Sequence, residues 1–303
     1  MAHAGAQQIR FRCAIAALSN KENIHVYSQD TSGGIREARF ENGQWAGGDE
    51  GSILKHGVPG TPIAAVRRNQ DERVHVFYIA EGNVARQIQR DPRGRWQDGD
   101  LNQANVLVAP YSMIVACYVE DANQPLRLYV QLLDNSIQEY GSDDSGRGWS
   151  QMANLGPALP GTGLALFCQD ENMAITERCC RDGRTWKNGN LSIAKANPRT
   201  DLTALRCGNN EVRVYYVDRD NRIKERLTTN DNWREGQFDQ PCVPGSQVAA
   251  VSWEGSRKDS SAFSHNQCNI RVYFQDGHQV TAITEWKYDG KWEQGHRGLP
   301  PAQ

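Results

Sequence analysis

Three arginines of this chain are each followed, at a short and nearly constant interval, by a glutamate. The interval is twelve residues in two of the pairs and fourteen in the third. The pairs are Arg127 and Glu139, Arg213 and Glu225, and Arg271 and Glu285. One such pair is most simply an exposed ion pair, which contributes about 0–1 kcal/mol to stability. Recurrence of the pair favours a common function. A guanidinium donates hydrogen bonds and a carboxylate accepts them, so the two together can bind hydroxyl groups. Each charge-assisted hydrogen bond contributes about 1.5–3 kcal/mol.

The stretch EVRVYYVDRDNRIKER at 211–226 indicates how one pair is built. Two runs of alternating polarity flank turn residues at 218–220, so we expect a β-hairpin. We expect a register that places Arg213 directly opposite Glu225, since cross-strand partners share one face of a sheet. A tyrosine two residues after each arginine shares that face, where we expect it to pack beside the guanidinium. These tyrosines are Tyr129, Tyr215 and Tyr273.

The same kind of hairpin recurs along the chain. Tryptophans stand at intervals of 37 to 59 residues, at Trp45, Trp96, Trp149, Trp186, Trp233 and Trp292. Before each of them come short runs, for example AIAAL, then IHVYSQD, then IREARF, separated by turn residues. Because the runs alternate with a period of two, they predict four antiparallel strands in each repeat. Self-similarity at this period is typical of a repeat architecture.

Six repeats of a four-stranded unit predict an all-β fold, a six-bladed β-propeller. One domain covers 1–303, and its repeats span about 10–58, 59–108, 109–160, 161–197, 198–243 and 244–303. The small residues that open the repeats, as in AIAAL and QVAAV, fit this fold. Innermost strands crowd around a narrow axis, where larger side chains would collide.

The fourth repeat is shorter than the others. Only 37 residues separate Trp149 from Trp186, too few for a full opening strand, loop and second strand. Either the run GLALF at 163–167 serves in a three-stranded blade, or about fifteen residues are missing by comparison with the other repeats. Blades bury their faces against immediate neighbours, so we expect the ring to tolerate a short fourth blade.

Composition excludes several classes of partner. The net charge is −2 and the isoelectric point about 6.4. The chain therefore has neither the excess of positive charge typical of nucleic-acid-binding proteins nor a polybasic patch for a membrane surface. No run reaches the roughly 20 apolar residues that span a bilayer, and residues 1–20 lack the pattern of a signal peptide. We therefore expect a cytoplasmic protein without membrane insertion. Export without a signal, or association with a cell or spore surface, is the alternative.

The cysteines and histidines do not form a recognisable metal site. The eight cysteines include no CxxC pair, and the seven histidines form no HExxH or similar cluster. Buried reduced thiols are the simplest interpretation, with disulfides or a metal as alternatives. We expect no metal and no other cofactor.

A guanidinium fork, a carboxylate and an aromatic wall together suit a neutral sugar. The repeats IRVYFQD, IREA and NSIQEY, together with VAPYS, ALPGTG and LPPA, resemble those of the fungal fucose-specific lectins of the Aleuria aurantia lectin type. The resemblance covers essentially the whole chain. In that family fucose lies between blades, held by an Arg and a Glu or Gln of one blade and by aromatic residues of the next. The resemblance implies a multivalent lectin for L-fucose on fucosylated glycans and glycoproteins, without catalysis, and homodimers are common in the family.

The resemblance implies three sites that keep both charges. The first comprises Arg213, Glu225, Tyr288 and Trp292. The second comprises Arg271, Glu285, Phe40 and Trp45. The third comprises Arg127, Glu139 and Trp186. In this third site Cys180 stands where an aromatic residue belongs, so we expect weaker binding there.

Three further sites depart from the family pattern. One has His25 at the arginine position, with Glu37 and Trp96. Another has His75 and Gln87, with Trp149. The last has Ala165, with Glu177 and Trp233. An imidazole has fewer donors than a guanidinium and is mostly uncharged at neutral pH. We expect these three sites to be impaired or empty.

Two other functions stay open at this stage. The run SDDSGRGW at 142–149 fits a turn motif of sialidase propellers, which suggests a sialidase-like glycoside hydrolase. Such an enzyme needs two carboxylates within about 5–10 Å of each other, and no paired carboxylates recur in the sequence. A protein-interaction propeller is the second alternative, although its WD and GH signatures do not recur either.

Overall fold

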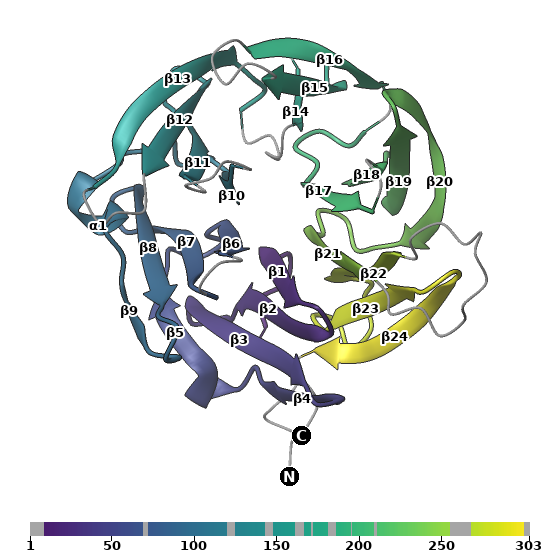
Figure 1. Ribbon diagram of the computed structural model, residues 1–303, viewed down its shortest axis with the longest axis horizontal. Helices are drawn as coiled ribbons and strands as arrows, with labels where there is room; N and C mark the ends of the chain where they lie inside the picture. Colours follow the sequence, from purple (N-terminus) through teal and green to yellow (C-terminus); the bar gives the residue numbers. More distant parts are fainter. Residues whose placement is uncertain are drawn as a thin grey trace.

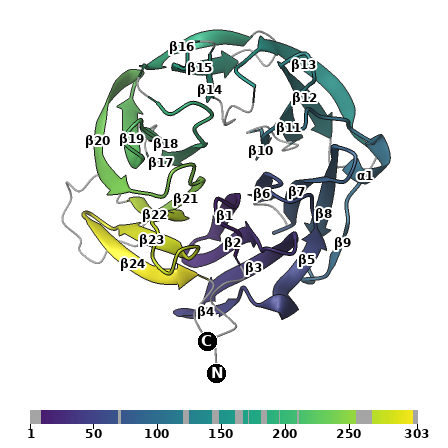
Figure 2. The same cartoon turned by 180° about the vertical axis from the view of Figure 1, so that it is seen from behind.

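The computed structural model places most of the chain in six antiparallel sheets. The described residues are 9–68, 72–119, 125–142, 148–160, 167–170, 172–178, 186–194, 196–208, 211–254 and 268–299, together with the backbone of 179–180. The sheets stand side by side in a ring, and the first and last sheets of the chain are neighbours (Figure 1, Figure 2). The predicted six-bladed β-propeller is therefore confirmed.

We name the sheets blades A to F in chain order. Blade A contains β1 (Ile15–Asn20), β2 (Asn23–Gln29), β3 (Gly34–Glu41), β4 (Gln44–Gly47), the 3-10 turn η1 (Glu50–Ser52) and β5 (Ile53–His56). Blade B contains β6 (Ile63–Arg67), β7 (Val74–Ala80), β8 (Val84–Arg90) and β9 (Trp96–Asp98), followed by α1 (Leu101–Ala104). Blade C contains β10 (Ile114–Tyr118), β11 (Leu126–Gln131), β12 (Ser136–Ser142) and β13 (Ser150–Pro157).

The second half of the ring contains blades D, E and F. Blade D contains β14 (Phe167–Gln169), β15 (Ile175–Cys180) and β16 (Trp186–Ile193). Blade E contains β17 (Leu202–Cys207), β18 (Glu211–Val217), β19 (Arg222–Thr229) and β20 (Asn232–Pro241). Blade F contains β21 (Val248–Glu254), β22 (Cys268–Gln275), β23 (Ile283–Tyr288) and β24 (Trp292–Leu299). Helices in the described ranges are all too short or too polar to cross a membrane.

Blade D has three strands among the described residues. Its first described strand, β14, occupies the place of the second strand of other blades, since Phe167 pairs with Glu177 as Tyr215 pairs with Glu225 in blade E. Residues 161–166, which include Ala165, lie outside the described part of the chain. The same holds for 143–147, at the centre of the sialidase-like motif.

The turn between the second and third strands has one form in four blades. The backbone N–H of its first residue donates to the carbonyl of the residue four positions later, in the pairs Asp30 and Gly34, Leu132 and Ser136, Asp170 and Ala174, and Asp218 and Arg222. The residue before this carbonyl acceptor has a left-handed φ of 56° to 90°, at Gly33, Asn135, Met173 and Asn221. This position fixes the register of the hairpin.

The register that we expected for blade E is wrong. Tyr215 lies directly opposite Glu225, and Arg213 lies opposite Leu227. The turn closes between Asp218 and Arg222, with Asn221 in the left-handed conformation that asparagine tolerates, and this moves the pairing by two residues. Arg213 and Glu225 still share a sheet face, now as diagonal neighbours.

Buried glutamines join successive blades. The side chain of Gln29 donates to the carbonyl of Val58 at 2.9 Å and accepts from the N–H of Gly60 at 2.6 Å, at the start of blade B. Gln131 and Gln169 make corresponding bonds to the next linker. In blade F, Gln275 bonds to the backbone of residues 10 and 12 instead. The same contact that links consecutive blades therefore also closes the ring.

The innermost strands β1, β6, β10, β17 and β21 surround an axial cavity of about 210 Å³. Alanines make up much of its lining, as the small residues at the start of each repeat predicted. Asp201 is an acidic exception at the start of β17, and its Oδ2 accepts from the N–H of Val248 in blade F at 2.7 Å.

Cys207 and Cys268 form a disulfide that joins β17 of blade E to β22 of blade F. The expectation of a reduced thiol is wrong for these two cysteines. The packing of blades E and F places their Cα atoms 5.7 Å apart, a separation that a disulfide spans readily. Sequence spacing alone does not show which cysteines of different repeats lie close enough to form a disulfide. Among the other described cysteines, Cys13, Cys117, Cys168 and Cys242 are free.

Candidate functional site

We use the word cleft for the boundary between two neighbouring blades and name each cleft by its two blades. In every cleft an aromatic residue of the first blade packs edge-on against a tryptophan of the second, with ring centroids 5.8 to 6.4 Å apart. The pairs are Tyr27 and Trp96 (A/B), Phe77 and Trp149 (B/C), Tyr129 and Trp186 (C/D), Phe167 and Trp233 (D/E), Tyr215 and Trp292 (E/F), and Tyr273 and Trp45 (F/A). All six tryptophans singled out in the sequence therefore lie at a cleft.

A carboxylate or amide side chain stands directly opposite each of these aromatic residues in its hairpin. These are Glu37, Gln87, Glu139, Glu177, Glu225 and Glu285. In the four clefts where the aromatic residue is tyrosine, its hydroxyl donates to Oε1 of the glutamate at 2.8 to 3.0 Å. Burial and then the glutamate charge raise the pKa of Tyr27, Tyr215 and Tyr273, so these phenols stay protonated as donors. The sequence had suggested packing beside the arginine only.

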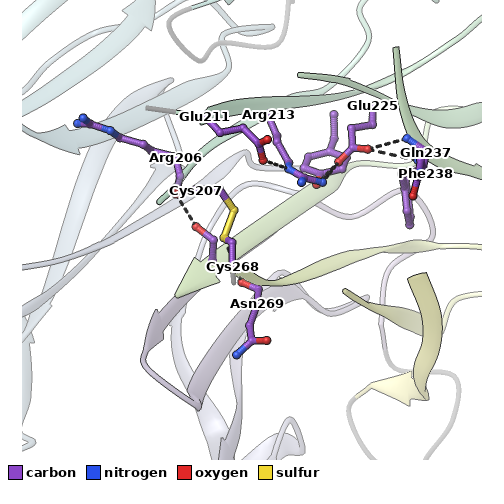
Figure 3. A network of polar contacts seen from close by, with 11 residues as sticks. Arg206, Cys207, Glu211, Arg213, Glu225, Gln237, Phe238, Cys268 and Asn269 are labelled. Atoms are coloured by element: carbon purple, nitrogen blue, oxygen red, sulfur yellow. Dashed lines mark hydrogen bonds and ion pairs between the residues drawn. A yellow bond between two sulfur atoms is a disulfide. The ribbon is translucent and has the colours of Figure 1, made fainter. Parts of the chain in front are cut away.

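The E/F cleft holds the most firmly fixed arginine (Figure 3). Nη1 of Arg213 donates to Oε1 of Glu225 at 2.8 Å, and Nε donates to Oε1 of Glu211 at 2.7 Å. Burial works to lower the pKa of this guanidinium, but the charge of Glu225 and then the contact with Glu211 raise it above its ordinary value. Arg213 is therefore a permanent cation, and its Nη2 makes no hydrogen bond to the described residues.

Glu225 is the anchor of this arginine. Its Oε2 accepts from the backbone N–H of Gln237 at 3.0 Å and of Phe238 at 3.3 Å, and its side chain is 0% exposed. Gly236 permits this approach, since a Cβ there would lie 2.0 Å from Oε2 of Glu225. Glu225 thus orients Arg213, and Glu211, whose side chain is 23% exposed, is the more accessible acceptor. The sequence analysis did not single out Glu211. It could have been found from its place two residues before Arg213, because residues two apart in a strand share one face.

Aromatic rings of blade F form the other wall of the E/F cleft. Cζ of Arg213 lies 5.0 Å from the centroid of the Tyr288 ring. The rings of Tyr288 and Trp292 are 5.2 Å apart, and Phe238 of β20 lies 4.4 Å from Trp292. The structure therefore brings together the four residues predicted for the first site.

The F/A cleft keeps the same groups in a looser arrangement. Nε of Arg271 lies 3.9 Å from Oε1 of Glu285, and its Cζ lies 4.8 Å from the ring of Trp253 in the same blade. The predicted rings of blade A, Phe40 and Trp45, are 5.4 Å apart. Trp253 was not predicted; it lies in the innermost strand, outside the repeated pattern of tryptophans.

In the C/D cleft, Nε of Arg127 lies 3.3 Å from Oε1 of Glu139. Within the described residues the Glu139 carboxylate accepts one hydrogen bond, from Tyr129 to Oε1, and its side chain is 10% exposed. Trp186 contributes one ring to this cleft. Cys180 pairs with Trp186 in the backbone register, but its side chain lies outside the described part of the structure.

The A/B cleft contains a cation that the sequence analysis missed. Nδ1 of His25 lies 2.8 Å from Oε1 of Glu37, as expected for a residue in the arginine position. Nη1 of Arg90, from blade B, lies 3.8 Å from the same oxygen. Cζ of Arg90 is also 5.8 Å from the ring centroid of Trp96.

The two remaining clefts lack the charged pair among the described residues. In B/C, Nδ1 of His75 lies 2.6 Å from Nε2 of Gln87, whose Oε1 accepts from the N–H of Leu101. In D/E, Oε2 of Glu177 accepts from two backbone N–H groups, at Asn190 and Leu191. In the part of the chain that the structure describes, neither arrangement presents a guanidinium beside its tryptophan.

Together these clefts offer a neutral, hydroxyl-rich ligand two kinds of contact. The guanidinium N–H groups are charge-assisted donors, and the carboxylates are acceptors. The rings cover an apolar face of a ligand and contribute by burial of its carbon-bound hydrogens.

Comparison with known proteins decides the family. The sequence profile of the fungal fucose-specific lectins matches residues 9–302. The chain belongs to the fungal fucose-specific lectin family. The resemblance seen in the repeats is thereby confirmed. Lectins bind carbohydrates without converting them, so family membership opposes the sialidase-like alternative.

Individual members of the fungal fucose-specific lectin family are similar over most of the chain. A fucose-specific lectin of Arthroderma benhamiae is 37% identical, over 95% of this chain and 89% of that protein. The solved structure of SapL1 lectin in complex with α-methyl fucoside is 35% identical, with a TM-score of 0.85 over 99% of this chain and 100% of that one. The six-bladed lectin of Aleuria aurantia, 24% identical with a TM-score of 0.81 over 96% and 97% of the two chains, shares the fold.

Proposed function

We propose that this protein is a multivalent lectin that binds L-fucose on fucosylated glycans and glycoproteins in the clefts between its blades. The observation that carries the proposal is the E/F cleft. There Arg213, fixed by two carboxylates, faces Tyr288 and Trp292 of the next blade. The fucose-specific relatives support the choice of sugar, and SapL1 was solved with α-methyl fucoside.

The chemistry of the E/F cleft suits a deoxysugar. The two N–H bonds of the Nη2 group of Arg213 lie in the guanidinium plane and can donate to neighbouring ring hydroxyls in fixed directions, which a lysine cannot reproduce. Glu211 is placed to accept from a hydroxyl. The rings of Tyr288 and Trp292 provide the apolar wall for a methyl group and for carbon-bound hydrogens, which are poorly solvated by water.

The three clefts with both charges should differ in affinity. Arg213 is already held at Nε and Nη1, so it loses little freedom when the sugar binds, and a preorganised site retains more of its gross binding energy. Arg271 lies 3.9 Å from its glutamate and must be drawn into place. In the C/D cleft the second blade offers one described ring, that of Trp186. We expect the order E/F, then F/A, then C/D.

Multivalency follows from the ring. Each cleft alone should bind fucose modestly, because a small ligand makes few contacts and the costs of association are large. Several clefts on one rigid disc raise the effective concentration of the second and later sites on a branched glycan. Binding to a surface that displays many fucose residues should therefore be much tighter than binding of the free sugar.

Two further parts of the proposal rest on the family resemblance and the sequence alone. A homodimer would double the number of clefts, and light scattering at micromolar concentration would detect it. A cytoplasmic location, with export without a signal as the alternative, is testable by fractionating the producing cells. Neither part is needed for fucose binding by one chain.

The test of the proposed function is calorimetric titration with methyl α-L-fucoside. The wild type should bind, and Arg213→Ala should lose the tightest site, with affinity there reduced at least about tenfold, because charge-assisted hydrogen bonds are removed. Arg213→Lys, which keeps the charge but not the fork, should recover only part of the loss. Absence of any binding by the wild type would refute the proposal, and turnover of an aryl fucoside would refute its non-catalytic part.

A further inference from the structure

One position in the third strand decides which group faces the tryptophan of the same blade. In blade F, Tyr288 of β23 pairs with Trp292, and in blade A, Phe40 of β3 pairs with Trp45. In blade B the equivalent residue, paired with Trp96, is Arg90 of β8. A guanidinium thus stands in the A/B cleft at the place where two other clefts present a ring.

The A/B and E/F clefts contain the same kinds of group, but the blade that supplies each group is exchanged. In E/F the guanidinium comes from the first blade and lies 5.0 Å from a ring of the second, Tyr288. In A/B the first blade supplies a ring, the imidazole of His25, and the second supplies the guanidinium of Arg90. Both reach Oε1 of Glu37, at 2.8 Å and 3.8 Å.

The acceptor of the A/B cleft is ionised and slightly exposed. Burial raises the pKa of Glu37, but the hydrogen bond from His25 and the charge of Arg90 outweigh it and hold the pKa below its ordinary value. The Tyr27 hydroxyl fixes the carboxylate as in the other clefts, at 2.9 Å. The side chains of Glu37 and Arg90 are 8% and 19% exposed, against 0% for Glu225.

We infer that the A/B cleft is a fourth fucose site, in which Arg90 of the second blade supplies the guanidinium that the first blade lacks. Arg90 donates to the sugar hydroxyls, Glu37 accepts from them, and Trp96 covers the apolar face, while His25 holds the carboxylate in place through Nδ1. This inference rests on the proposed function and revises the expectation that His25 marks an impaired site. Because Arg90 takes the place of a second ring, the site binds fucose more weakly than E/F.

The other two altered clefts do not share this compensation. In D/E the residue paired with Trp233 is Thr228, which carries no charge. In B/C the acceptor is Gln87, an amide already bonded to His75 and to the N–H of Leu101. The A/B cleft differs from both because cation, carboxylate and indole all meet in the described structure.

The experiment isolates the A/B cleft by removing the three arginines of the intact pairs. The background variant is Arg127→Ala/Arg213→Ala/Arg271→Ala, titrated with methyl α-L-fucoside by calorimetry. It should retain about one weak site per chain, and adding Arg90→Ala should abolish that site. The matched control adds Arg95→Ala instead. Arg95 follows β8 in the same blade, is 71% exposed and pairs with Asp91, so its loss removes an equal charge without touching the cleft.

The outcomes separate this inference from the proposed function. Loss of the residual site with Arg90→Ala, and its survival with Arg95→Ala, supports the inference. A background variant that binds nothing, or a residual site that persists without Arg90, overturns the inference and leaves the function standing if the wild type binds. A wild type that does not bind fucoside at all refutes the function itself.

A second measurement does not depend on the folding of the variants. A crystal of the wild type soaked with excess methyl α-L-fucoside should show the sugar in the A/B cleft within hydrogen-bond distance of Arg90 and Glu37. Sugar in the E/F, F/A and C/D clefts together with an empty A/B cleft overturns the inference.

Discussion

The carboxylate of Glu225 receives hydrogen bonds from a phenol, a guanidinium and two backbone N–H groups. It cannot turn without losing several of them, so it holds Arg213 in one place. In C/D and F/A fewer groups hold the glutamate, and the distance from the nearest arginine nitrogen grows from 2.8 Å to 3.3 Å and 3.9 Å. At the scale of single residues, binding strength should therefore follow the anchoring of the carboxylate.

Tyr215→Phe tests this anchoring. The change removes one donor to Glu225 but keeps the ring that packs against Trp292. We expect a loss of about 0.5–1.5 kcal/mol in the free energy of unfolding, measured by urea titration. Affinity of the E/F cleft should fall a few-fold, because Arg213 is held less firmly; calorimetry in the Arg90→Ala/Arg127→Ala/Arg271→Ala background measures it. Tyr216→Phe, on the opposite face of β18, should leave this affinity unchanged, and equal affinities for both variants would disprove the anchoring role.

At the scale of elements, the strands were predictable and their register was not. Alternating runs and recurring tryptophans follow from burial of one face and from repetition, both of which are local in sequence. The register depends on which turn residue takes the left-handed conformation. In blade E this residue is Asn221, which lies just after the turn expected at 218–220. Arg90 and Glu211 escaped notice for a related reason. Their roles depend on which wall of a cleft a residue faces, and spacing within one repeat does not show that.

The disulfide between β17 and β22 is a covalent cross-link between blades E and F, in addition to the backbone that connects them. Cys207 pairs in register with Glu211, which binds Nε of Arg213, so the bond lies beside the E/F cleft (Figure 3). Structural disulfides persist in oxidising surroundings and are rare in the cytosol. The oxidation state of these cysteines in protein from its source would therefore bear on the expected cytoplasmic location.

Removal of this link should destabilise the ring. The bond closes a sequence separation of 61 residues, and the double variant Cys207→Ser/Cys268→Ser should lose about 2–4 kcal/mol of stability. Thermal unfolding of the wild type with and without a phosphine reductant measures the same effect. The reductant should lower the midpoint of the wild type and leave that of the double variant unchanged. A wild-type midpoint that does not respond would show that the bond is absent or contributes nothing.

At the scale of the whole molecule, the ring is closed by contacts between its first and last blades rather than by a shared sheet. Gln275 bonds to the backbone of residues 10 and 12, and β1 lies beside β21 (Figure 1). Around the axis, Asp201 makes a comparable link between blades E and F through the N–H of Val248. Since each cleft lies between two blades, every binding site depends on how well these joints hold the blades in place.

Asp201 makes the stability of the ring depend on pH. Burial raises the pKa of this carboxyl from 3.8 to about 7, although hydrogen bonds from the backbone of Val248 and Leu202 oppose the change. The folded chain therefore keeps a proton that the unfolded chain has released, so the contribution of Asp201 is full in acid and is lost as the pH rises through about 7. Asp201→Asn stays neutral and keeps an acceptor for Val248. Its urea midpoint relative to the wild type should be higher at pH 8 than at pH 5. An equal difference at both pH values would mean that Asp201 is ionised throughout and that water in the axial cavity solvates its charge.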